Sequence, residues 1–467
     1  MNNQSTFALY FGNRGFFPES LIDAARNQIT GILDKSGYKY IMMDPGATRY
    51  GAIETKEEGL KYAAFLSENR GKYDGVLLIL ANFGDENGAI AAMQDAGTPI
   101  FIMAYPDELD KMDFNSRRDA FCGKFSIMDV FYQYGLPYTA FMPHVIDPAT
   151  KEFERQIECF DRVCRVANGM KRITIGALGA RTTAFKTVRW DELALQRYGI
   201  TVDTLDMSEV FRRVRTMDVS RSDCKDKAER LKNYTNFKNA NEKDFGNLVR
   251  FGVAIDDIIK EYAFDAISLR CWLEMEIEFG VAPCVLLSEI NDRGIAASCE
   301  MDVCNAVSMH ALNLATGGPS TCLDWNNNYG TDPDKCILFH CGPVPQTLMD
   351  GKGEVIEHAM FAKSLGAGCG MGCNAGRIAK NDFTFTSSKT QDGKFWMYLG
   401  EGRFTGEKIE KGFFGCGGVA QIEGLQKKLY NIGYQGYRHH TSVAAGHVEQ
   451  ALREAFTRYL KYEITEI

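Results

Sequence analysis

The residues Val76-Leu-Leu-Ile-Leu-Ala81 form a short, continuous apolar run, which is typical of a fully buried β-strand. Other apolar runs of this kind surround it, at Phe7–Phe11, Tyr40–Met43 and Ile100–Ala104. Residues with helical spacing fill the intervals at Glu19–Gly37 and Gly59–Glu68. Because strands alternate with helices, this part of the chain is predicted to form a parallel, doubly wound sheet.

The same alternation returns after the charged segment Lys151–Arg172. Strands are predicted at Ile173–Leu178, Val202–Leu205, Ala266–Leu269 and Cys284–Leu287, with helices around Trp190–Tyr198 and at Val303–Leu314. After Gly317, β-like runs follow one another without a helix between each, at Thr321–Asp324, Cys336–His340, Phe383–Ser387 and Phe395–Leu399. A helical pattern at Val443–Tyr462 ends the chain. We therefore predict an α/β protein with two doubly wound domains, residues 1–170 and 171–317, and a β-rich, mainly antiparallel domain, residues 318–467.

Composition narrows the class of protein. Fifty-three basic against sixty-one acidic residues give a net charge of −8, which argues against a nucleic-acid partner. Apolar runs fall far short of the roughly 20 residues that a membrane crossing needs. No basic leader precedes the first apolar run, so we expect a cytoplasmic protein. The fourteen cysteines have irregular spacing, and we expect free thiols rather than a disulfide framework.

The segment Gly366–Gly376 is rich in glycine and contains Cys369 and Cys373. It lacks the strand, helix and downstream acid of a dinucleotide-binding loop, and no second cysteine pair offers zinc spacing. A redox role for these thiols would show as colour, zinc or iron in the purified protein. We favour a tight loop whose glycines let the backbone approach another element.

Two acids and a histidine form a second group of candidates. Glu300 precedes the helical pattern that starts at Val303 and would lie in the first turn of that helix, while Asp324 closes an apolar run. His440 belongs to Arg438-His-His-Thr-Ser-Val-Ala-Ala-Gly-His447, where we expect the head of a helix. Taken one by one, Glu300 could be a helix cap and Asp324 a turn residue. Composition and periodicity do not unite them in one site.

Several motifs, in order, resemble one enzyme family. They are Gly12-Asn-Arg14-Gly-Phe-Phe-Pro-Glu19, Gly176-Ala-Leu-Gly179, Ala297-Ser-Cys-Glu300-Met-Asp302 with Asn305-Ala-Val-Ser-Met309, Asp324 24 residues after Glu300, and His440-Thr-Ser-Val-Ala-Ala-Gly-His447. The chain resembles the L-fucose isomerase and L-arabinose isomerase superfamily along nearly its whole length. The resemblance implies a metal-dependent aldose–ketose isomerase with Glu300, Asp324 and His440 as metal ligands, the two acids also transferring protons. The seven-residue step to His447 selects His440 over His439.

The oxygen-rich ligand set favours Mn²⁺, or Mg²⁺, and leaves positions for two sugar oxygens. The resemblance further implies an enediol intermediate and a homo-oligomer, a hexamer in the family. It also suggests a set of substrate-binding residues: Arg14, Phe83, Arg270, Trp272, His340 and His439. The substrate is either a neutral sugar of the fucose or arabinose type or an anionic one such as sulfoquinovose, converted to sulfofructose, because guanidinium groups bind anions well. The alternative is a sugar-binding protein of the same fold that needs no metal and performs no turnover.

Overall fold

The computed structural model describes residues 4–467 and divides into two compact units. Unit 1 contains the chain up to Asn168 together with Gln450–Lys461, and unit 2 contains Gly169–Glu449 and Tyr462–Ile467. The prediction of three separate domains stays a prediction, because unit 2 contains both a parallel sheet and a β-rich region. No helix within residues 4–467 has the length and hydropathy to cross a membrane.

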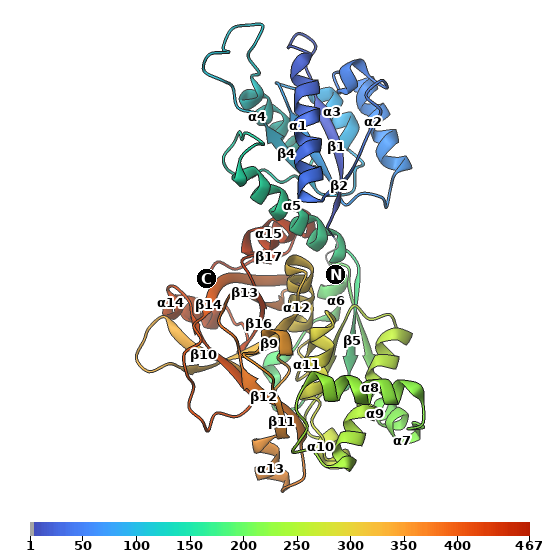
Figure 1. The fold of residues 1–467 in the computed structure, drawn as a ribbon, viewed down its shortest axis with the longest axis vertical. Helices are drawn as coiled ribbons and strands as arrows, with labels where there is room; N and C mark the ends of the chain where they lie inside the picture. Colours follow the sequence, from blue (N-terminus) through green and yellow to red (C-terminus); the bar gives the residue numbers. More distant parts are fainter. Residues whose placement is uncertain (1–3) are drawn as a thin grey trace. The chain divides into compact units, whose positions relative to one another are not determined.

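Unit 1 is built on a parallel sheet with strand order β2-β1-β3-β4, drawn in blue to teal in Figure 1. The strands are β1 (Thr6–Gly12), β2 (Lys39–Met42), β3 (Gly75–Leu80) and β4 (Ile100–Ala104), which confirms all four predicted runs. The helices are α1 (Ser20–Ser36), α2 (Lys56–Glu68), α3 (Glu86–Met93), α4 (Ala120–Gln133) and α5 (Lys151–Gly169), with the 3₁₀ turn η1 (Arg49–Gly51). β3 and β4 are buried at every position, as expected of a sheet covered on both faces.

The end of the chain returns to unit 1. α15 (Glu449–Glu454) continues into the π-helix η4 (Ala455–Leu460), where the Tyr459 hydroxyl lies 3.0 Å from Thr139 Oγ1. The predicted helix at Val443–Tyr462 is therefore wrong in its first part, since Val443 belongs to a strand, β16 (His440–Ala445). Every residue from His440 to Ala444 is buried, the polar His440, Thr441 and Ser442 included, so the strand lacks the apolar–polar alternation by which a half-buried strand is recognised.

A second parallel sheet, with strand order β6-β5-β7-β8, opens unit 2. Its strands are β5 (Ile173–Leu178), β6 (Ile200–Leu205), β7 (Ala266–Leu269) and β8 (Ala296–Ser298). The helices of this part are α6 (Glu192–Gln196), α7 (Met207–Thr216), α8 (Ser222–Tyr234), α9 (Glu242–Glu261), α10 (Glu274–Phe279), α11 (Cys284–Asp292) and α12 (Val303–Thr316), with η2 (Lys186–Val188). The predicted strand at Cys284–Leu287 is wrong, because these residues begin α11. That helix is buried from Cys284 to Asn291, and its first four residues are all apolar, so this short run shows no 3.6-residue period.

The β-rich region contains a closed barrel. β9 (Ser320–Asn328), β10 (Lys335–His340), β15 (Cys416–Gln421), β14 (Lys394–Phe404), β13 (Asn381–Gln391) and β16 pair in this order, and β16 pairs back onto β9. All of these pairings are antiparallel, which confirms the predicted β-rich, mainly antiparallel region. β11 (Glu354–Glu357), β12 (Met371–Arg377), β17 (Glu463–Ile464), α13 (Ala359–Leu365), α14 (Leu425–Tyr434) and η3 (Gln346–Leu348) complete the region.

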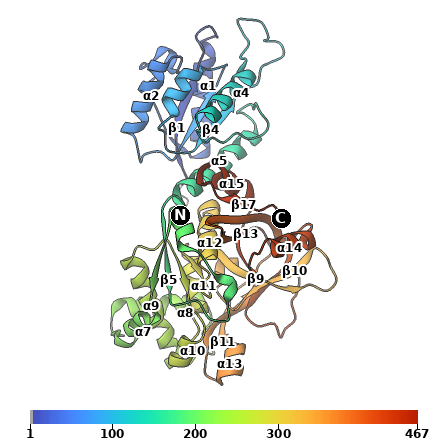
Figure 2. The same ribbon diagram turned by 180° about the vertical axis from the view of Figure 1, so that it is seen from behind.

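Helix α12 packs against both the parallel sheet and the barrel strands β9, β13 and β16. Figure 2 shows it between the green strand β5 and the orange and red barrel strands. Ten of its residues are buried, as a helix covered on two sides requires. The loop before α12 therefore lies where the parallel sheet meets the barrel.

The glycine-rich segment makes the close backbone approach that we predicted. Gly372 has φ 139°, and a Cβ built there would lie 2.0 Å from the carbonyl oxygen of Ala282. The predicted loop is correct only for the first part of the segment, since strand β12 starts at Met371. Cys373 is buried, and burial raises the pKa of its thiol to about 12. A reactive thiolate at Cys373 has no support in this setting.

Candidate metal centre

Three predicted ligands meet where the parallel sheet adjoins the barrel. Glu300 follows β8, Asp324 lies within β9, and His440 is the first residue of β16. β16 and β9 pair in a register that sets His440 directly opposite Asp324. The loop after β8 carries Glu300 to the same place, at the carboxyl end of a parallel strand, where ligands of α/β sheets bind.

The imidazole of His440 faces both carboxylates. Its Nε2 lies 3.3 Å from Oε2 of Glu300 and 3.3 Å from Oδ1 of Asp324. Within residues 4–467, each of these three atoms is buried and has no hydrogen-bond partner. Buried polar atoms are rarely left without a partner in native proteins. Two carboxylate oxygens and one imidazole nitrogen converging in this way have the chemistry of a divalent-cation site.

Asp302, which the sequence reasoning did not assign to the site, holds His440 in place. Oδ2 of Asp302 accepts a 2.8 Å hydrogen bond from Nδ1 of His440. Because the ring proton is on Nδ1, the lone pair of Nε2 points toward Glu300 and Asp324, the usual arrangement for a metal-binding histidine. Asp302 also accepts hydrogen bonds from Asn305 and pairs with the buried Arg438.

The electrostatics of this network are strongly coupled. Burial alone would raise the pKa of Asp302, but Arg438 and His440 hold it well below the usual range. Burial of Glu300 acts in the same direction, yet His440 lowers the pKa of that carboxyl too. Burial opposes protonation of His440, whereas Cys322, Asp302 and Glu300 raise its pKa well above the ordinary value. The ionised carboxylates of Asp302 and Glu300 therefore favour a positive charge between them, at His440.

The local backbone differs from the prediction. Glu300 does not lie in the first turn of α12; it precedes the helix with φ 61°, and Met301 follows with φ 64°. The cap of α12 is Asp302, whose side chain accepts from the backbone N–H of Asn305. Left-handed backbone at non-glycine residues is uncommon and concentrates at functional sites. His440 likewise starts a strand, not a helix.

His439 and His340 lie beside the three predicted ligands. Nε2 of His439 is 3.6 Å from Oδ1 of Asp324, but its side chain is 46% exposed, against 0% for His440. Ligand atoms of Glu300, His439 and His440 lie within 4.8 Å of one another, as do those of Cys322, His340 and His440. The structure thus gathers both additional histidines around the predicted centre.

Arg270 and Trp272 follow β7, next to the Glu300 loop. The sulfur atoms of Cys271 and Cys299 are 3.1 Å apart, which joins the two segments. Arg270 donates from Nε to the carbonyl oxygen of Trp272 and pairs with Glu274 at 3.1 Å. The ring of Trp272 packs among aromatic side chains, those of Phe185, His358 and Phe361.

Arg14 and Phe83 belong to unit 1 and contact each other there. The Arg14 guanidinium carbon lies 4.0 Å from the centre of the Phe83 ring, and Nη2 lies 3.5 Å from Glu86. Both residues follow carboxyl ends of neighbouring parallel strands, β1 and β3. Their predicted roles toward the sugar stay predictions.

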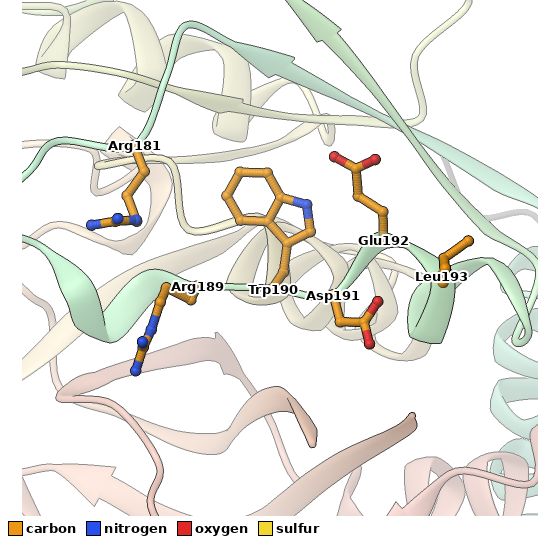
Figure 3. Close-up of a pocket in the computed structure, with 6 residues that line it drawn as sticks. All are labelled: Arg181, Arg189, Trp190, Asp191, Glu192 and Leu193. Atoms are coloured by element: carbon orange, nitrogen blue, oxygen red, sulfur yellow. The ribbon is translucent and has the colours of Figure 1, made fainter. Parts of the chain in front are cut away.

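A pocket of about 560 Å³ lies in the loop that follows β5. In Figure 3, the guanidinium groups of Arg181 and Arg189 lie on one side of the Trp190 indole, and the carboxylates of Asp191 and Glu192 lie on the other. The carbonyl oxygen of Arg189 accepts a 3.4 Å hydrogen bond from Arg438. The pocket is thereby linked to the residues that support His440.

Two family models match the chain. "Fucose/sulfoquinovose isomerase, N-terminal domain" matches residues 8–171, and "L-fucose isomerase, C-terminal domain" matches residues 338–467. The chain belongs to the L-fucose isomerase-like superfamily. The resemblance predicted from its motifs is thus confirmed.

Curated relatives within this superfamily carry the name sulfoquinovose isomerase. The protein from Priestia aryabhattai is 23% identical over 411 residues, covering 86% of this chain and 87% of that protein. The protein from Clostridium sp. (strain MSTE9) is 26% identical over 315 residues, covering 65% and 67%, and that from Alkalicoccus urumqiensis is 22% identical over 400 residues, covering 84% and 86%. Among solved structures, apo D-lactate dehydrogenase from Escherichia coli aligns with a TM-score of 0.17 at 8% identity, covering 67% of this chain and 98% of that chain. That alignment carries no argument.

The superfamily and these relatives identify the chain as an aldose–ketose isomerase. They favour an enzyme over a sugar-binding protein without turnover. The possible ligand clusters around His440 agree with a superfamily that is generally metal-dependent.

Proposed function

We propose that this isomerase is metal-dependent, with Glu300, Asp324 and His440 as the ligands of one divalent cation. The observation that carries the proposal is the convergence of Oε2, Oδ1 and Nε2 of these residues, each buried and without a hydrogen-bond partner in the described chain. A cation among them would satisfy all three at once. The orientation of His440 by Asp302 supports the same assignment.

The donor set favours Mn²⁺, with Mg²⁺ second. Two carboxylates are hard oxygen ligands, which these ions prefer. The Cys322 sulfur is close to His440, but burial raises the pKa of that thiol to about 11. One thiol beside two carboxylates and an imidazole leaves a donor set made mainly of oxygen and nitrogen, so a thiolate-binding metal has less support.

The reaction we propose moves two protons within the substrate, one from C2 to C1 and one from the C2 hydroxyl to the C1 oxygen. A bound divalent cation would polarise the carbonyl and spread the negative charge that develops in an enediol. Glu300 and Asp324 are the proton-transfer candidates: a carboxylate takes the proton from C2 of the aldose and returns it at C1. The C1 carbonyl becomes a hydroxyl and the C2 hydroxyl becomes a carbonyl, so no external oxidant or reductant is needed.

An anionic aldose of the sulfoquinovose type, converted to sulfofructose, is the substrate we favour. The names of the curated relatives support it, and so do Arg181 and Arg189, since a guanidinium binds a sulfonate well. Neutral fucose- or arabinose-type sugars are the second candidate, supported by the fucose isomerase family model. The resemblance also supports a cytoplasmic homo-oligomer, a hexamer in the family, in which Arg14 and Phe83 contact the sugar of a neighbouring subunit.

Deuterium uptake tests the function. Mn²⁺-loaded protein is incubated in heavy water with a panel of neutral and sulfonated aldoses. The incorporation of deuterium at C2 of the aldose is then followed. We expect exchange with a sulfonated aldose, loss of exchange with a chelator, and recovery on adding Mn²⁺. Glu300→Gln should fold and lose exchange, whereas Glu423→Gln, at an exposed position of unit 2, should behave as the parent protein. Full exchange by Glu300→Gln, or exchange that survives complete metal removal, would reject the proposal.

A further inference from the structure

His340 ends strand β10 and presents a buried ring to the metal centre. Its side chain is 1% exposed, and its ring centre lies 5.7 Å from that of His440. Nδ1 of His340 receives a hydrogen bond from the backbone N–H of Cys341, with an N···N distance of 2.8 Å. Nε2 is buried and has no hydrogen-bond partner among residues 4–467.

The contact with Cys341 determines where the ring carries its proton. A backbone N–H can only donate, so Nδ1 of His340 must offer its lone pair. The neutral ring then has its proton on Nε2, and this N–H is a hydrogen-bond donor. A buried donor without an acceptor is unfavourable, which indicates that a group from outside the chain accepts from it.

This tautomer decides between two roles for His340. Ligand atoms of His340, His440 and Cys322 lie within 4.8 Å of one another, which on distance alone would allow His340 to bind the metal. As a ligand, Nε2 would need its lone pair, and the proton would move to Nδ1. Two N–H groups, those of Nδ1 and Cys341, would then face each other at 2.8 Å. The structure therefore favours a donor over a fourth ligand.

We propose that Nε2–H of His340 donates a hydrogen bond to the sugar oxygen that bears the developing negative charge during isomerisation. This inference rests on the proposed function, because it requires a substrate whose oxygens lie at the Glu300–Asp324–His440 centre. The donor is fixed in place by the backbone and shielded from water. Such a preorganised donor stabilises the transition state more than the ground state, because charge increases on the acceptor as the proton leaves C2.

The test separates metal binding from turnover. His340→Phe keeps a flat ring and removes the donor, while His340→Gln keeps an N–H donor. For each, Mn²⁺ affinity is measured by electron paramagnetic resonance titration, and kcat and KM by ketose formation. We expect Mn²⁺ affinity within threefold of the parent protein in both. We expect kcat to fall roughly 10²–10³-fold in His340→Phe, the effect of losing one oxyanion donor. In His340→Gln, which keeps a donor, we expect this fall in kcat to be at least tenfold smaller.

Two outcomes would overturn the inference. A loss of Mn²⁺ affinity beyond tenfold in either variant would make His340 a ligand, and a kcat within twofold of the parent protein in His340→Phe would remove its role. If His340→Phe does not fold, the affinity and kcat of His340→Gln still decide, since a ligand role predicts weak metal binding there. A parent protein that binds Mn²⁺ but turns over no aldose would instead count against the proposed function.

Discussion

Oδ2 of Asp302 accepts a 2.8 Å hydrogen bond from Nδ1 of His440, and neither side chain is exposed to solvent. Arg438 pairs with Oδ1 of the same carboxylate, so the charge of Asp302 is shared between a guanidinium and an imidazole. This pairing fixes the ring of His440 and directs Nε2 toward Glu300 and Asp324. Asp302 therefore positions the imidazole of His440, the metal ligand that we propose.

Replacing Asp302 should weaken metal binding. Asp302→Asn keeps the shape but loses the charge that makes His440 a good ligand, and we expect Mn²⁺ affinity to fall roughly 10–100-fold. Asp382→Asn is the matched control, because Asp382 faces His447 at 3.5 Å on an exposed part of unit 2. Both variants are titrated with Mn²⁺, and their Mn²⁺ affinities are compared with that of the parent protein. Asp302→Asn leaves the buried charge of Arg438 without its partner, so the double variant Asp302→Asn, Arg438→Met removes that charge as well. Unchanged Mn²⁺ affinity in the folded double variant would contradict the positioning role.

Arg181 and Arg189 should bind the anionic group of the substrate. Within the described residues, neither Arg181 nor Arg189 has a carboxylate at ion-pair distance, whereas Arg270 is already paired with Glu274. We expect Arg181→Gln with Arg189→Gln to raise KM for a sulfonated aldose about tenfold or more, since charge-assisted hydrogen bonds are lost. KM for a neutral aldose should stay within threefold. Arg212→Gln, at an exposed position of α7, is the control, and equal effects on both sugars would contradict the prediction.

The sequence predicted strands well where an apolar run had polar boundaries, as in β1, β3 and β4. It misassigned Cys284–Leu287 and Val443, because both lie in elements that are buried on all sides and show no period. Glu300, Asp324 and His440 were predicted as ligands only through a resemblance, and the structure brings these three side chains together. Asp302 was missed although it lies two residues from Glu300. Its pairing with Arg438 spans 136 residues, and no local pattern reveals such a contact.

The prediction of a close backbone approach at the glycine-rich segment can be tested at Gly372. A Cβ there would lie 2.0 Å from the Ala282 carbonyl oxygen, and φ is 139°. Gly372→Ala should therefore destabilise unit 2 by more than ~2 kcal/mol, the range of overpacking and backbone strain. Gly368→Ala separates the two effects, since Gly368 also has positive φ, 88°, but a Cβ built there would meet no atom within 4 Å. Thermal melting checks this, and equal losses in both variants would mean that strain, not the contact, dominates.

Glu276 in α10 should make the protein less stable as pH rises. Its carboxylate is 0% exposed, and both oxygens lack a hydrogen-bond partner among the described residues. Burial raises the pKa of Glu276 from 4.5 to about 8. The folded protein therefore holds this proton over a pH range in which the unfolded chain has lost it, so the stability of the folded state falls between about pH 5 and pH 8.

Glu276→Gln removes that titration and keeps the side-chain shape. We expect the variant to match the parent protein near pH 5 and to be more stable at pH 8.5 by a few kcal/mol, on the basis of ~1.4 kcal/mol per pKa unit. The melting temperature measured at several pH values gives the difference. Glu278→Gln serves as a control, because Glu278 is half-exposed and pairs with Arg215 at 2.6 Å. A difference between Glu276→Gln and the parent protein that is the same at pH 5 and pH 8.5 would contradict the raised pKa, since only a group that titrates between them gives a pH-dependent gain.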